Sequence, residues 1–213
     1  MNTRPPSYKR IDELRALFEE RKESIRRRLD DFAAVAPDEY FYELVYCLLT
    51  PQSSAVNAAK AVETLRSVDV FGTDVETAGV LHQKEFYIRF HNTKAKHIRA
   101  AKENFEKIRR VVSTGSASPQ MREWLVRNVQ GLGWKEASHF LRNIGHRNLA
   151  ILDRHILRNL KRHNVLRTIP ATLTPKRYRS IEMRFARFAQ AVGISMDELD
   201  LLFWSRETGK ILK

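Results

Sequence analysis

The sequence predicts an all-α protein, and two observations lead to that prediction. Apolar residues recur at three- and four-residue spacing along most of the 213-residue chain, which is the period of a helix that buries one face. No segment alternates apolar and polar residues with the period of two that a half-buried strand requires. Because only eight glycines and seven prolines interrupt the chain, we expect about ten helices joined by short turns.

The predicted helices begin near the N-terminus. The first is long and amphipathic, and its apolar stripe consists of Ile11, Leu14, Phe18, Ile25, Leu29 and Phe32. Pro37 is expected to open a second helix that ends at Leu49, since proline suits the first helical turn. Ser53 or Ser54 can cap a third helix that reaches Arg66, because a serine side chain accepts a hydrogen bond from the first turn.

The rest of the chain repeats this pattern. Two further stripes predict helices, namely Ile98, Ala101, Phe105, Ile108 and Val112, and then Ile181, Phe185, Phe188 and Val192. Ser195 is expected to cap the last helix, which runs to Arg206. Joints are expected near Pro51, Gly72, His91 to Thr93, Thr114 to Pro119, Gly145 to Asn148 and Thr168 to Pro175. The stretches before and after about Ser118 each hold enough apolar surface for a core, so we expect one unit of two helical lobes with a cleft between them.

The charge of the chain indicates a polyanionic partner. Lys and Arg number 38 against 25 for Asp and Glu, which gives a formal net charge of +13. Nucleic acid is the first candidate, because Lys and Arg that contact phosphates release condensed counterions. An anionic membrane surface is the second, but no single amphipathic segment carries the excess charge.

Cysteine content and hydropathy exclude several classes of protein. The single cysteine, Cys47, excludes an intramolecular disulfide, a cysteine-based zinc site and a cysteine-ligated iron–sulfur cluster, and it favours a reducing compartment. The longest apolar run, Leu44 to Leu49, is much shorter than the roughly 20 residues that span a bilayer. Met1 to Arg10 lacks the apolar core of a secretory signal, so we expect a cytoplasmic protein.

The most informative segment runs from Val129 to Leu160. Its helical pattern stops at Gln130-Gly131-Leu132-Gly133 and restarts at Trp134. Two glycines around one apolar residue permit a tight turn with positive φ and a close approach of a ligand to the backbone. The next helix would then direct its free N–H groups and its positive dipole end outward, which suits a phosphate. The pattern indicates a helix-hairpin-helix motif, although Gly131 and Gly133 by themselves are better explained by an ordinary αα-hairpin that ends at a glycine.

Two charged residues add to the hairpin. Lys135 lies in the first turn after it, and Asp153 follows at the predicted start of another helix. With these residues the chain resembles the helix-hairpin-helix DNA glycosylases. The strings GLGWKEASHFLRNIG and AILDRHILR are similar to the second subtype of 8-oxoguanine DNA glycosylase/AP lyase, which is common in archaea and some thermophilic bacteria. The similarity is close from Gln130 to Arg162 and weaker elsewhere, including CLLTPQSSA and the final LLFWSRETGKILK.

This resemblance implies a fold and an activity. The fold would be two helical lobes with an active-site cleft between them, and the segment of residues 118–163 would carry the hairpin and the catalytic groups. The activity would be excision of 8-oxoguanine from DNA, followed by cleavage of the strand by β-elimination through a Lys Schiff base. Endonuclease III, a relative in the same superfamily, has four cysteines that bind an iron–sulfur cluster; their absence here argues against the repair of pyrimidine lesions by that branch.

Lys135 and Asp153 are the candidate catalytic residues. A neutral Lys135 amine would attack C1′, displace the base and form the Schiff base; burial and cationic neighbours favour that neutral form. Loss of the base builds positive charge at C1′, which a carboxylate at Asp153 would stabilise. Asp153 also suits the N-cap of a helix from Arg154 to His163, and one oxygen can cap while the other faces the sugar. A monofunctional alkyl-base glycosylase would retain the Asp without the Lys, so Lys135 favours lyase activity.

Other positions are candidates for base eversion or base recognition, but each of them also has a structural explanation. Gln52 matches the position at which superfamily members place a polar wedge in the duplex, but it is nearly as well explained as a surface turn residue. Trp204 could stack on the everted base or pack among neighbouring apolar residues. The carboxylate of the final residue, Lys213, could accept hydrogen bonds from the base, although final residues usually fray. Trp134 and Phe140 are expected to be core residues around the hairpin.

The same residues and the same resemblance lead to expectations about cofactors and partners. The histidines, among them His139, His155 and His163, do not have a spacing that indicates a metal site, and no metal cofactor is required. The resemblance implies a monovalent cation at the hairpin carbonyls. We expect a nucleoid-associated monomer that binds duplex DNA containing oxidised guanine and no membrane. Two alternatives are a noncatalytic DNA-binding module and a glycosylase for another damaged base.

Overall fold

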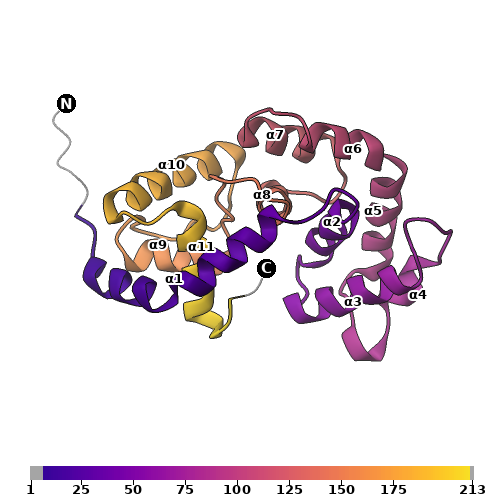
Figure 1. Ribbon diagram of the computed structural model, residues 1–213, viewed down its shortest axis with the longest axis horizontal. Coiled ribbons are helices and arrows are strands. Elements are labelled where there is room, and N and C mark those ends of the chain that lie inside the picture. The colour runs from indigo at the N-terminus through magenta and orange to yellow at the C-terminus, as the bar shows by residue number, and fades with distance from the viewer. Residues whose placement is uncertain (1–6, 212–213) are drawn as a thin grey trace. The chain divides into compact units, whose positions relative to one another are not determined.

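The computed structural model describes residues 7–211, and the regular elements of that part are helical, so the all-α prediction is confirmed (Figure 1). The elements are α1 (Ile11–Ala33), α2 (Tyr40–Leu49), α3 (Ala55–Ser67), α4 (Thr77–Leu81), the 3-10 turn η1 (Lys84–Phe86), α5 (His91–Glu103), α6 (Phe105–Val112), α7 (Ser118–Asn128), α8 (Trp134–Asn143), α9 (Arg154–Arg162), α10 (Pro175–Val192) and α11 (Met196–Thr208). No helix among residues 7–211 is both long enough and apolar enough to cross a membrane.

The helices form two compact units, but not with the division expected near Ser118. Residues 35–144 make up unit 2, and the described residues on either side of that range make up unit 1. The reason is which helices pack together: α8 lies against α2 and α7, whereas α1 lies against α11 from the other end of the chain. An apolar stripe predicts that a helix buries one face, but it does not predict against which other helix that face packs.

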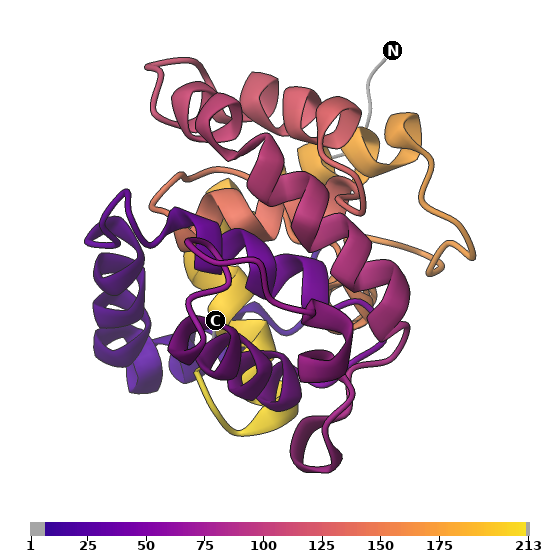
Figure 2. The ribbon, with the colours of Figure 1, turned by 90° about the vertical axis from the view of Figure 1, so that its right-hand side faces the viewer.

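Unit 2 is built around α2 (Figure 2). This helix is buried on nearly all sides and contacts α3, α5 and α8. The longest apolar run of the sequence lies in it, because a central helix has no solvent face to keep polar. The helix begins at Tyr40 and not at Pro37; the amide of Glu39 donates to the carbonyl of Ala36 in a turn that precedes it. Its end at Leu49 is as predicted.

Unit 1 consists of α1, α9, α10 and α11. Helix α1 is the predicted long amphipathic helix, and its stripe from Leu14 to Phe32 is buried. The cap predicted at Ser195 is confirmed, because its side chain accepts a hydrogen bond from the amide of Glu198. In unit 2, Ser54 caps α3 by accepting from the amide of Asn57 at 3.0 Å. The local hydrogen-bonding signals in the sequence thus locate these helix starts correctly.

Candidate active site

The hairpin predicted from two glycines joins α7 to α8. Gly131 has a φ of 85°, in the left-handed region that favours glycine. A Cβ at this position would also overlap the imidazole ring of His97 on α5. Leu132, between the glycines, is buried with 5% exposure and anchors the turn in the core of unit 2. Backbone conformation and the neighbouring side chain therefore both require glycine at position 131.

Gly133 differs from the expectation of a positive φ. Its φ is −86° and its ψ is −177°, an extended conformation that any residue adopts, because Gly133 is the N-cap of α8. A Cβ there would lie 2.9 Å from Oε2 of Glu136, the end of a flexible side chain. Gly133 has no side chain that could accept a hydrogen bond from the first turn of α8. The residue therefore leaves these amides accessible to another acceptor.

A buried arginine holds the two helices of the motif together. Arg122 of α7 is 1% exposed; its Nη1 donates to Oγ of Ser138 on α8 at 3.2 Å. Its guanidinium also covers the ring of Trp134, 4.6 Å from the ring centroid. Phe140 is completely buried, as predicted, and Trp134 is half-buried over Arg122. The hairpin is thus presented by a packed pair of helices.

Lys135 is the second residue of α8. Its side chain is 28% exposed, and its Nζ lies 3.3 Å from Oε1 of Glu136. A second lysine lies near it: the Lys135 ammonium contributes to lowering the pKa of Lys94, although burial is the larger cause. Unit 2 thus brings the hairpin, Lys135 and Lys94 into one neighbourhood.

Lys94 was not predicted from the sequence. It lies in the first turns of α5, is 5% exposed, and burial lowers its pKa to about 8. Its Nζ donates to the carbonyl of Leu49 at 2.6 Å, to the carbonyl of Pro51 at 2.7 Å and to Oγ of Ser53 at 3.2 Å. In the sequence it is one lysine among several in a basic stretch, and nothing local marks it as buried.

The turn that Lys94 contacts contains Gln52. This residue is exposed and has a φ of 57°, which is uncommon for a residue other than glycine. Residues kept in that region are found where the surrounding structure fixes them, often at functional sites. The side chain predicted as a wedge thus stands on an exposed, strained turn.

Asp153 is the N-cap of α9, as its sequence position predicts. Its Oδ1 accepts hydrogen bonds from the amides of His155 and Ile156, both at 2.8 Å. Its Oδ2 accepts a hydrogen bond from Nε1 of Trp204 at 3.1 Å. The expectation that one oxygen caps the helix is confirmed, and the other oxygen is held by the indole.

Trp204 therefore has a contact that neither of its two predicted roles includes. It lies on α11, is half-buried, and its ring meets the ring of His155 edge-on at 5.6 Å. Because 51 residues separate it from Asp153, no local pattern could have shown the hydrogen bond. Asp153 and Trp204 belong to unit 1, and Lys135 belongs to unit 2. Lys213, the other candidate for base recognition, lies outside the described residues.

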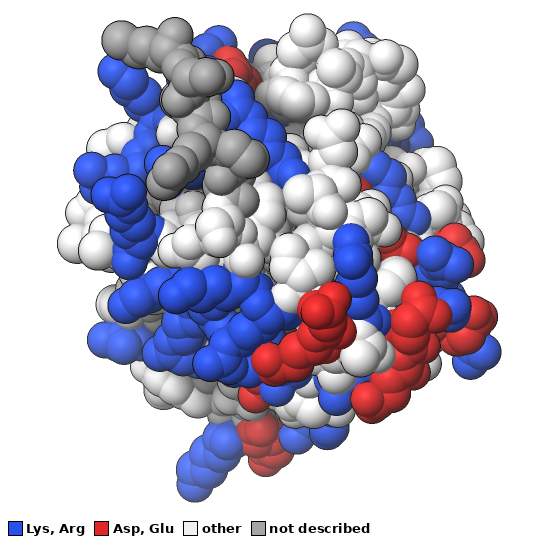
Figure 3. Space-filling view, turned by 90° about the vertical axis from the view of Figure 1, so that its left-hand side faces the viewer, with Lys and Arg blue, Asp and Glu red and all other residues white. Residues whose placement is uncertain are grey.

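Basic side chains are concentrated on two helices of unit 1. Helix α9 carries four exposed Lys and Arg residues and no acid, and α10 carries five and one Glu. Figure 3 shows a face of the molecule on which Lys and Arg gather, with Asp and Glu toward one side. Such a surface attracts phosphate groups. Among residues 7–211, no group of three or more metal-ligating side chains is close enough to hold a metal ion.

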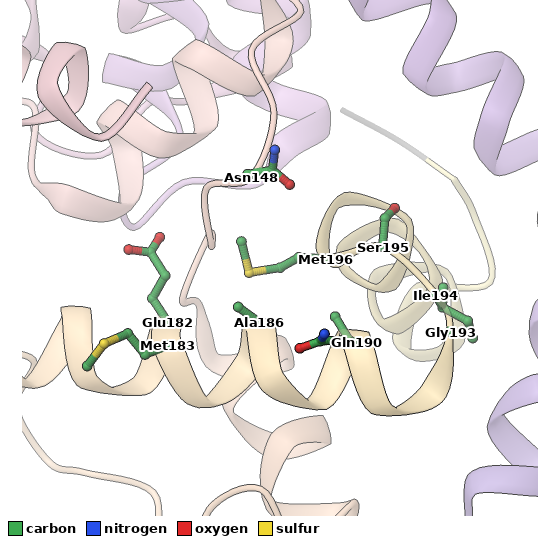
Figure 4. A pocket seen from close by; sticks show the side chains of 10 residues that line it. Asn148, Glu182, Met183, Ala186, Gln190, Gly193, Ile194, Ser195 and Met196 are labelled. Carbon is green, nitrogen blue, oxygen red and sulfur yellow. The ribbon is translucent and has the colours of Figure 1, made fainter. Parts of the chain in front are cut away.

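A cavity of about 430 Å³ lies in unit 1 (Figure 4). It is lined by α10, by the loop of residues 193–195, by Met196 at the start of α11 and by Asn148. Neither Asp153 nor Trp204 lines it. Its lining is mainly apolar and includes Met183 and Met196. The cavity is therefore not the site at which Asp153 would act.

Known proteins resemble the chain along nearly its whole length. A family model described as 8-oxoguanine DNA glycosylase matches residues 25–194. An 8-oxoguanine DNA glycosylase/AP lyase of Fusobacterium nucleatum is 38% identical over 95% of this chain and 97% of its own. One of Korarchaeum cryptofilum is 40% identical over 90% of this chain and 91% of its own.

Solved structures agree with these matches. The 8-oxoguanine DNA glycosylase of Thermotoga maritima has a TM-score of 0.84 and 35% identity, covering 95% of this chain and 98% of that one. The glycosylase/lyase of Methanocaldococcus jannaschii, solved in complex with a 15-mer DNA containing 8-oxoguanine, has a TM-score of 0.85 and 35% identity, covering 95% and 99%.

Proposed function

The chain belongs to the 8-oxoguanine DNA glycosylase family, and we propose on that premise that it excises 8-oxoguanine from duplex DNA and then cleaves the strand as an AP lyase. The observation that carries this function is the match to relatives of that activity over nearly the whole chain. The excess of basic residues supports DNA as the substrate, since phosphate contacts supply much of the affinity for a duplex. The protein would act as a monomer on nucleoid DNA.

Lys135 is the proposed nucleophile. Its neutral Nζ attacks C1′ of the damaged nucleotide, the bond from C1′ to the base breaks, and the base leaves with the bonding electrons and takes up a proton. The new C1′–N bond becomes a Schiff base when the sugar ring opens. Loss of a proton from C2′ then expels the 3′ phosphate, which cuts the strand, and water releases Lys135.

Asp153 is the proposed electrostatic partner. Positive charge grows at C1′ as the base departs, and a fixed carboxylate lowers the free energy of that transition state. The two amides on Oδ1 and the indole N–H on Oδ2 support this role, because all three donors bond to the charged carboxylate and restrict its rotation. Trp204 would then orient Asp153 through the indole N–H at the edge of the Trp204 ring. The face of the Trp204 ring remains a candidate stacking surface for the base, and Lys213 remains a candidate for base recognition.

The hairpin is the proposed phosphate site. Gly131 makes the turn and Gly133 leaves the first amides of α8 uncapped, where a phosphate oxygen can accept from them. A monovalent cation bound by hairpin carbonyls would add positive charge beside that phosphate. Gln52 is the proposed wedge, which fills the space that the everted base leaves in the duplex.

Borohydride trapping tests the chemistry directly. Reduction of the Schiff base should link the wild-type protein covalently to a duplex with 8-oxoguanine, and Lys135→Gln should abolish that product. Lys102→Gln is the matched control, because it removes another half-buried lysine of unit 2, whose Nζ donates to the carbonyl of Thr73. Undiminished trapping of Lys135→Gln would show that another amine is the nucleophile.

A further inference from the structure

Lys94 is a buried cation whose hydrogen-bond partners in the described part of the chain include no carboxylate. Within residues 7–211 its Nζ donates to two backbone carbonyls and one hydroxyl, and the residue is 5% exposed. An ammonium has three hydrogen-bond donors, and each of them has one acceptor here. Such a site costs free energy, because a charge leaves water without gaining an opposite charge. The lowered pKa of Lys94, about 8, has that origin.

The three acceptors enclose one turn of the chain. Leu49 is the last residue of α2, and Pro51 and Ser53 stand on either side of Gln52. Lys94 thus binds the backbone before Gln52 and the side chain after it. Oγ of Ser53 also accepts a hydrogen bond from the amide of Arg89 at 3.2 Å, so the turn is held from two segments.

Gln52 depends on this support for its conformation. A φ of 57° at a residue other than glycine is strained, and it persists only where neighbouring contacts determine it. The carbonyl of Pro51 belongs to the peptide group directly before Gln52, and Lys94 holds that group at 2.7 Å. Fixing it limits the rotation that would relax Gln52.

We propose that Lys94 is a positioning residue for base eversion: its ammonium holds the turn of residues 50–53 so that Gln52 enters the duplex as the damaged base leaves. The inference rests on the proposed wedge role of Gln52. It assigns Lys94 to recognition of the intact lesion and not to the chemistry of Lys135. An apolar residue at this position would avoid the buried charge but would leave the turn without its three donors.

The experiment is a double-mutant cycle on two substrates. Single-turnover rates are measured for the wild type, Lys94→Met, Gln52→Ala and the double variant. One substrate is a duplex with 8-oxoguanine; the other is the same duplex with a preformed abasic site, which has no base to evert. Lys102→Met is the matched control, since it removes a lysine on the same helix that also binds a loop carbonyl.

Lys94→Met should slow excision of 8-oxoguanine by about 10- to 100-fold, the scale of a displaced positioning element. Cleavage at the abasic site should change by less than about threefold, and Lys94→Met should add no further loss in the Gln52→Ala background, because both act through one element. Lys102→Met should behave as the wild type.

Ser53→Ala removes one acceptor and leaves the charge in place. It should slow excision of 8-oxoguanine by a smaller factor, about threefold, without slowing cleavage at the abasic site. This variant tests the same inference if Lys94→Met does not fold.

Two other results are informative. Equal loss on both substrates, or a loss that adds fully to that of Gln52→Ala, would overturn the inference and assign Lys94 to the surroundings of Lys135 or to the core. Normal excision by Gln52→Ala would reject the wedge itself, and the inference with it. A slow Gln52→Ala combined with a fully active Lys94→Met would reject the inference alone.

Discussion

The starts of α8 and α9 carry the two proposed catalytic residues in opposite ways. The N-cap of α9 is Asp153, whose carboxylate accepts from two first-turn amides and lies at the positive end of the helix dipole. The N-cap of α8 is Gly133, which has no capping side chain, and the cation of Lys135 lies at the positive end of that helix. One start is favourable for stability and the other is not.

This difference shows which kind of functional residue can be recognised in a sequence. At α9 one residue serves both stability and chemistry, so Asp153 could be read as an ordinary cap. At α8 the two demands conflict, since a cap would occupy amides that a phosphate can use and an anion would suit the dipole better than Lys135 does. A residue that contradicts the local rule is the stronger indication of function.

The largest effect is expected from Lys135→Gln. Excision should fall by at least about 10³-fold, as on loss of other covalent nucleophiles. The free energy of unfolding should stay the same or rise by up to about 1 kcal/mol, because the substitution removes a cation from a helix N-terminus. Single-turnover kinetics and urea unfolding measure the two effects. A clear loss of stability would mean that the ion pair with Glu136 stabilises the protein by more than the helix dipole destabilises it. Lys135 would then not reduce the stability of α8.

At α9 the expected result separates two substitutions of Asp153. Asp153→Asn keeps a capping oxygen but removes the charge and the acceptor of the indole N–H, so excision should slow by about 10²- to 10³-fold with a stability loss of about 1 kcal/mol, the net contribution of one hydrogen bond. Asp153→Ala should slow excision as much and should destabilise the protein by about 2 kcal/mol, because it loses the cap as well as the bond to the indole. Thermal unfolding and excision rates distinguish the two. If Asp153→Asn excises at the wild-type rate, the residue is a cap and nothing more.

Trp204→Phe tests whether the indole orients Asp153. The substitution keeps an aromatic ring that can pack and stack but removes the N–H that bonds to Oδ2. We expect about a tenfold lower excision rate, with substrate affinity nearly unchanged and a stability loss of about 1 kcal/mol, the net contribution of one hydrogen bond. Affinity is measured with a lesion duplex under non-cleaving conditions. A loss confined to affinity would assign Trp204 to base stacking instead.

Short-range patterns predicted much of the site, and tertiary contacts account for what they missed. The hairpin, Lys135 and Asp153 lie within 23 consecutive residues, Gly131 to Asp153, so their spacing along the chain shows them. The bond from Trp204 to Asp153 and the contacts from Lys94 to Leu49 and Pro51 span 51, 45 and 43 residues. Such contacts depend on how helices pack, and helical periodicity does not specify packing partners.

Helix boundaries show the same limit. The stripe from Ile98 to Val112 predicts one helix, but α5 ends at Glu103 and α6 begins at Phe105. Both helices bury the same kind of face, so the apolar pattern continues across the break. The sequence did not predict the division of the chain into units, because α1 packs against α11. These helices are far apart in the chain, and no local sequence pattern indicates that they pack together.

Gly131→Ala addresses the turn that precedes α8. Its positive φ and the imidazole of His97 both oppose a Cβ, so we expect a stability loss of about 1 kcal/mol or more. Affinity for duplexes with and without the lesion should fall in the same proportion, because backbone contacts carry no base information. Unfolding and fluorescence-anisotropy titrations measure both. A loss of affinity for the lesion duplex alone would argue against a general phosphate grip.

The smallest effect is expected from Gly133→Ser, which gives α8 the kind of start that α9 has. The backbone of Gly133 is extended, as at the serine caps of α3 and α11, so the substitution brings no backbone strain. A serine hydroxyl would accept from a first-turn amide and should raise stability by a few tenths of a kcal/mol, the usual advantage over glycine at this position. The same bond would compete with a phosphate, so duplex affinity should fall by about two- to fivefold. Gly133→Ala is the control, since it adds the Cβ near Glu136 without the hydroxyl. If Gly133→Ser binds DNA as tightly as Gly133→Ala, the uncapped amides do not contact phosphate, and the weak start of α8 needs another explanation.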